Sequence, residues 1–124
     1  GGDIFIKIQR QRTIGIFAGN SPLTGKLGLE LNPEDTPLGI CTSSGTVGHS
    51  LSFGRADAVI VLADSATLAD AAATAIGNRV SEPPDIEKGI ELARDMGKLR
   101  GAVIIKDDKL GVWGAVKIVP TTSE

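Results

Sequence analysis

The alternation of hydrophobic and polar residues predicts three strands in the first part of the chain. Residues 3–8, DIFIKI, carry isoleucine at every second position, which is the period of a strand with one buried face. Residues 13–18 predict a hairpin partner for that strand. Residues 26–31 alternate again and predict a third strand, which the sequence NPEDTP then ends.

Later segments predict strands that are more deeply buried. Residues 38–41 are a short apolar run, and residues 57–63, DAVIVLA, are the continuous β-branched run expected of a central strand covered on both faces. The closing segment 101–119 predicts two strands around the turn KDDKLG, with Trp113 and Val116 as core candidates.

Two helices are predicted between these strands. Residues 66–78 are rich in alanine, Ser65 can cap their start, and a Gly-Asn pair can close their end. A second helix is expected after Pro84 and Asp85, because apolar residues then recur at helical spacing. The fold class is therefore predicted to be α+β, with a mostly antiparallel sheet of about six strands and two helices on one face.

Composition narrows the function classes. The 124 residues suit one domain, and a formal net charge of −2 gives no cationic stripe, so a nucleic-acid partner is not expected. The sequence contains no run of about 18 apolar residues, so it predicts no membrane-spanning helix. A single cysteine cannot form an internal disulfide, which favours a reducing, cytoplasmic setting.

The segment GICTSSGTVGHS, residues 39–50, holds the only cysteine and the only histidine of the chain. Cys41 can act as a nucleophile or sulfur carrier if its thiolate is stabilised, with His49 as the base, or it can be a buried structural residue. The residues after it can expose backbone N–H groups to a phosphate or carboxylate, or can simply satisfy turn geometry. These candidate anion-binding residues are Thr42, Ser43, Ser44, Gly45 and Thr46.

Two further patterns are candidates for ligand contacts. Asp70 and Thr74 are four residues apart in the first predicted helix, so they share one face and can offer oxygen atoms to Mg²⁺. By spacing alone, Asp70 can equally be a solvated residue. Gly1 and Gly2 precede Asp3 and permit close approach of the backbone to a ligand, or they are a cloning remnant.

Segments GGDI (1–4), TSSG (42–45) and VIVLADSATLADAAATAI (59–76) resemble the second half of the ApbE superfamily of flavin transferases, and closer still a short, poorly characterised branch of it. The resemblance implies a T-fold-like half domain, FAD or FMN, Mg²⁺, and transfer of FMN to a threonine of a partner protein. It implies metal ligands at Asp70 and Thr74. It assigns cofactor contacts to Gly1, Gly2, Asp3, Thr42, Ser43, Ser44 and Gly45.

The same resemblance predicts that residues 1–124 are the C-terminal half of a longer protein. The missing N-terminal half is then an expected partner, and an abrupt start without methionine fits that expectation.

Three functions follow as hypotheses. The first is binding of a phosphorylated small molecule or flavin nucleotide with Mg²⁺. The second is sulfur transfer through a persulfide on Cys41 in thiol metabolism. The third is a non-catalytic domain that serves oligomer or partner contacts, with homo-oligomers expected.

Overall fold

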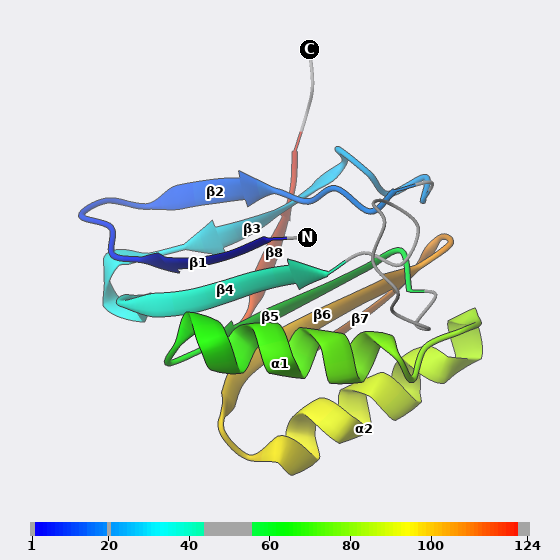
Figure 1. The fold of residues 1–124 in the computed structure, drawn as a ribbon. Coiled ribbons are helices and arrows are strands. Elements are labelled where there is room, and N and C mark those ends of the chain that lie inside the picture. Colours follow the sequence, from blue (N-terminus) through cyan, green and yellow to red (C-terminus); the bar gives the residue numbers. More distant parts are fainter. Residues whose placement is uncertain (1, 20, 44–55, 122–124) are drawn as a thin grey trace.

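Eight strands form two antiparallel sheets (Figure 1) in the structure, a computed structural model that describes residues 2–19, 21–43 and 56–121. The five-stranded sheet has the order β1-β4-β5-β6-β7, and the three-stranded sheet the order β2-β3-β8. The strands are β1 (Gly2–Ile6), β2 (Arg12–Gly15), β3 (Leu27–Leu31), β4 (Leu38–Ser43), β5 (Ala58–Ala63), β6 (Leu99–Lys106), β7 (Lys109–Gly114) and β8 (Lys117–Pro120).

Both helices cover one face of the five-stranded sheet (Figure 1). Helix α1 (Ala66–Gly77) begins where the Ser65 hydroxyl accepts a hydrogen bond from the Leu68 amide at 3.1 Å, as its sequence predicts. Helix α2 (Ile86–Met96) follows a 3-10 turn at Pro83–Asp85 and ends at Gly97, whose φ of 70° is readily adopted only by glycine. A second 3-10 turn, Pro33–Asp35, joins β3 to β4.

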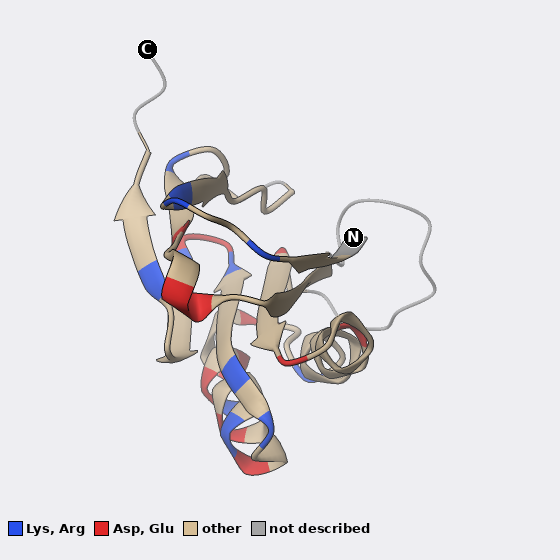
Figure 2. Ribbon diagram, turned by 90° about the vertical axis from the view of Figure 1, so that its left-hand side faces the viewer, with Lys and Arg blue, Asp and Glu red and all other residues tan. Residues whose placement is uncertain are grey.

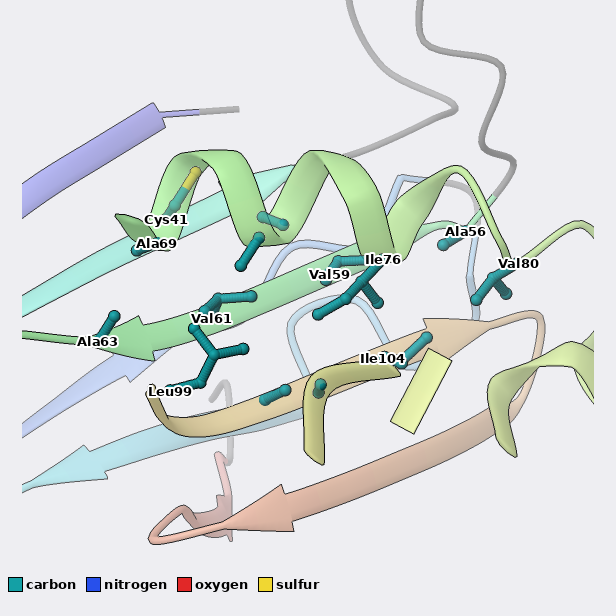
Figure 3. Close-up of a cluster of buried hydrophobic side chains, with 14 of the residues drawn as sticks. Cys41, Ala56, Val59, Val61, Ala63, Ala69, Ile76, Val80, Leu99 and Ile104 are labelled. Carbon is teal, nitrogen blue, oxygen red and sulfur yellow. The ribbon is translucent and has the colours of Figure 1, made fainter. Parts of the chain in front are cut away.

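The hydrophobic core has two layers separated by the five-stranded sheet. All six residues of β5 are buried. Val59, Val61 and Ala63 pack with the helices (Figure 3), whereas Ala58, Ile60 and Leu62 pack with the three-stranded sheet. A strand covered on both faces has no solvated side, which explains its uninterrupted apolar sequence.

The α+β class, the antiparallel sheet and the helices on one face are confirmed, but one predicted pairing is wrong. Residues 3–8 and 13–18 do not form a hairpin: β1 pairs with β4, and β2 pairs with β3. The intervening residues 7–11 contain no glycine, proline or asparagine to close a tight turn, and they lead from one sheet to the other.

The last predicted strand is two strands. β6 and β7 form the expected hairpin, but the chain turns at Gly114, where φ is 86°, before β8 joins the other sheet. A Cβ atom at this glycine would lie 2.5 Å from the Arg100 carbonyl oxygen, so only glycine fits.

Neither of the two α-helices in the described part of the chain has the length and apolar composition needed to cross a membrane.

Candidate functional site

Cys41 lies on the face of β4 that is turned toward α1. Its side chain is buried, with 2% of its surface exposed, and Figure 3 shows it beside α1 at one end of the helix-side core cluster. The Cys41 Sγ atom donates a hydrogen bond to Asp70 Oδ1 at 3.5 Å. A carboxylate beside the sulfur opposes the formation of a thiolate, because two negative charges would then be close together.

Asp70 and Thr74 occupy the same side of α1, and both side chains are exposed. The Thr74 hydroxyl donates to the Asp70 backbone carbonyl at 3.1 Å, which is the usual local bond of a helical threonine. Its oxygen keeps lone pairs that can accept another contact. Among the described residues, no three His, Cys, Asp or Glu side chains are grouped closely enough to hold a metal ion.

Helix α1 runs beside β4 in the same direction, which aligns several of the predicted site residues (Figure 1). Gly39 lies against the Ser65–Ala66 peptide, and Cys41 lies against Asp70. A step of two residues along a strand covers about 6.6 Å, and a step of four residues along a helix covers about 6 Å. Because Cys41 lies beside Asp70, Ser43, two residues further along β4, lies level with Thr74, four residues further along α1. A strand and a helix thus present two successive pairs of polar residues.

Asp3 joins this arrangement through the pairing of β1 with β4. Its Cα atom is the register partner of Cys41, and Gly2 is the partner of Thr42. The backbone of Asp3 therefore lies beside that of Cys41.

Thr42 lies on the opposite face. It lines a cavity of about 230 Å³ between the two sheets. The other lining residues are almost entirely apolar: Ile14, Gly15, Ile16, Phe17, Leu29, Ile40 and Ile60. Alternation along β4 therefore divides the predicted anion loop between two faces, with Ser43 on the helix side and Thr42 on the cavity side. A small ligand held beside Asp70 does not also fill this cavity.

Five of the predicted site residues cannot be placed. Gly1, Ser44, Gly45, Thr46 and His49 lie outside the described residues.

Two buried polar side chains were not anticipated from the sequence. Asp57 is 3% exposed, and its Oδ2 accepts a hydrogen bond from the Asp107 amide at 2.7 Å. Ser21 is also buried and donates to the Asp107 carbonyl. These bonds fix the β6–β7 turn to the start of β5 and to the loop after β2. The only sequence signal was an aspartate at the start of an otherwise apolar strand.

The fold and this site define an α+β domain with a carboxylate-bearing helix packed against the polar end of a buried strand. A family model described as "AbpE bacteria" matches residues 1–106, and the chain belongs to this family.

Several archaeal relatives match almost the whole chain. A UPF0280 protein of Methanocella arvoryzae is 47% identical over 120 residues, which cover 96% of this chain and 49% of that protein. UPF0280 proteins of Methanococcus aeolicus and Methanocaldococcus jannaschii are 41% and 45% identical, covering 100% and 94% of this chain and 52% and 50% of theirs. The chain thus spans about half the length of these relatives.

These matches correct the family expected from the sequence. The chain does not belong with the ApbE flavin transferases as their C-terminal half: the matching family is the one named above, and the relatives are UPF0280 proteins. The ligand roles that rested on that resemblance must therefore be argued from the geometry alone.

Proposed function

We propose that this protein binds a phosphorylated small molecule through a divalent cation held at Asp70. The observation that supports the proposal is the contact between Cys41 and Asp70, which holds the exposed Asp70 carboxylate beside the polar end of β4.

The chemistry of these groups suits Mg²⁺ better than a soft metal. Carboxylate and hydroxyl oxygens are the donors that Mg²⁺ prefers, and it commonly takes only one or two protein carboxylates while phosphate and water complete its shell. The hydrogen bond from Cys41 occupies part of Asp70 and fixes its position, while the exposed side of the carboxylate remains available to the cation. A flavin nucleotide such as FMN belongs to this ligand class and provides a convenient optical probe.

Sulfur transfer through Cys41 has weaker support. A persulfide-forming thiol needs access and a stabilised thiolate, whereas the Cys41 side chain is buried and its sulfur faces a carboxylate. We place the binding activity in the cytoplasm, where the lone cysteine stays reduced.

The test is a titration with Mn²⁺, followed by electron paramagnetic resonance, with and without FMN. Mn²⁺ replaces Mg²⁺ at oxygen-rich sites and is directly visible. Asp70→Asn should weaken Mn²⁺ binding at least about tenfold, a difference of about 1.4 kcal/mol. It should also abolish the change in Mn²⁺ binding that FMN causes in the unmodified protein. The asparagine oxygen can still accept the Cys41 hydrogen bond, so the packing of α1 is preserved.

Asp95→Asn is the matched control, because Asp95 is an exposed aspartate on α2. It should bind Mn²⁺ as the unmodified protein does. If Asp70→Asn and Asp95→Asn bind Mn²⁺ with equal affinity, the cation is not held at Asp70 and the proposal is wrong.

A further inference from the structure

Strand β7 is an open edge of the five-stranded sheet. Within the described residues it pairs only with β6. Leu110 and Val112 are 39% and 42% exposed, and their register partners Ile105 and Val103 face the three-stranded sheet. Natural edge strands are usually protected by charge, proline or a covering segment. Lys109, at the start of β7, is the only charged residue in this strand.

A groove of about 430 Å³ separates this edge from α2. Ile86 and Ile90 form its apolar floor together with Gly111, where a Cβ atom would lie 2.4 Å from Ile86 Cγ2. The absence of a side chain at Gly111 lets the helix lie directly on the strand. The groove and the exposed strand are continuous, so one partner can contact both.

The charged residues of α2 along the groove are arranged so that two antiparallel copies of the helix have opposite charges facing each other. Glu87 lies near the start of α2, Glu91 at its middle, and Arg94 toward its end. Figure 2 shows that α2 carries residues of both signs, and α1 by contrast contains a single charged residue, Asp70. When two copies of such a helix lie antiparallel, the arginine of each faces the glutamates of the other.

The geometry of sheets allows the two helices to meet. α2 packs on both β6 and β7, so its axis lies about half a strand spacing from β7. If two β7 edges pair antiparallel, the two α2 axes are about two strand spacings, roughly 9.6 Å, apart. Helices that pack side by side are separated by 8–10 Å. One two-fold axis therefore satisfies both the strand pairing and the helix contact.

We propose that two copies of this chain associate through β7 and α2. The dimer joins the two five-stranded sheets into one ten-stranded sheet, places the apolar residues Leu110 and Val112 of both copies side by side, and buries the groove. It is isologous, so each charged contact occurs twice. This surface lies at the sheet edge opposite β1 and β4, away from Asp70.

The test is sedimentation equilibrium of the 124-residue chain and of charge variants. The unmodified chain should sediment with twice the mass of one chain. Arg94→Glu should weaken the dimer roughly 100-fold, because each of two symmetric contacts changes from attraction to repulsion at about tenfold per contact. The double variant Glu87→Arg with Arg94→Glu reverses the charge order and should restore most of the affinity. All of these side chains are exposed, so the variants should fold normally.

The strand contact is tested separately with Val112→Lys, which should dissociate the dimer. Its matched control is Ile4→Lys on the edge strand β1, where Ile4 is 49% exposed; this variant should remain dimeric. Two results would overturn the proposal. One is a monomer at all concentrations up to about 1 mM, a dissociation constant too weak for specific association. The other is a dimer that Ile4→Lys dissociates and that Val112→Lys and Arg94→Glu leave intact.

Discussion

Gly39→Ala should strongly destabilise the protein, because this glycine is where β4 and the start of α1 touch. A Cβ atom at position 39 would lie 2.2 Å from the Ser65 carbonyl carbon, 2.4 Å from the Ser65 oxygen and 2.5 Å from the Ala66 nitrogen. All three are backbone atoms, so no side-chain rotation relieves the clash. Ordinary contacts begin at 3.4 Å, and the helix would have to move away by more than 1 Å.

The magnitude follows from what that movement disrupts. Inserting a methyl group into a well-packed site typically costs 1–3 kcal/mol, and rigid backbone neighbours favour the upper end, so we expect a loss of about 3 kcal/mol. A shift of α1 also separates Cys41 from Asp70, whose contact is 3.5 Å in the intact protein. Mn²⁺ binding at Asp70 should therefore weaken in the same variant.

Urea unfolding followed by the fluorescence of Trp113, the only tryptophan, measures this loss. Trp113 is packed against the core beneath the helices, so its emission reports their release. Gly15→Ala is the matched control: it is also a strand glycine, but a Cβ atom there meets nothing within 4 Å. The reasoning is refuted if Gly39→Ala loses less than about 1 kcal/mol while Gly15→Ala is neutral.

Two further predictions concern the helices. Gly77→Ala should raise the free energy of unfolding by up to about 1 kcal/mol in the same urea assay, because a Cβ atom meets only Val59 Cγ2 at 3.7 Å and alanine favours helix; a loss would contradict this. Backbone hydrogen bonds from Ser81 and Glu82, then Lys88, hold the pKa of Asp85 below its usual value. This stabilisation is complete above the usual aspartate pKa and lost as pH falls through the lower folded value, so Asp85→Asn should flatten the decline of stability between about pH 5 and pH 2; an unchanged slope would contradict it.

Local sequence signals were sufficient for the helices and for most strands. Ser65 caps α1 through a residue close to it in the chain, and the apolar run 57–63 is itself a local pattern. The helix start and the buried strand can therefore be deduced without knowledge of the fold. The pairing of β1 with β4 could not be deduced in this way, because it depends on a connection of some thirty residues that crosses between sheets. Pairing over such distances is decided by burial of whole faces.

The candidate site shows the same limit. Asp70 and Thr74 were predicted as neighbours because helical spacing is a local property. The bond between Cys41 and Asp70 joins residues 29 positions apart, and no spacing rule contains it. The division of Thr42 and Ser43 between two faces follows from strand alternation, but only once β4 is known to extend through Ser43. Local pattern therefore identified the groups, and the sheet decided which of them share a face.

The two proposed surfaces lie at opposite edges of one sheet, which makes them separable. Asp70 lies beside β4, near the β1 edge, and the dimer contact is at the opposite edge strand, β7. Between them β5 is fully buried in aliphatic packing, and buried packing of this density does not deform gradually. A dimer through β7 leaves both Asp70 sites on its outer flanks. Each copy should therefore bind its cation independently, and loss of either surface leaves the other available for measurement.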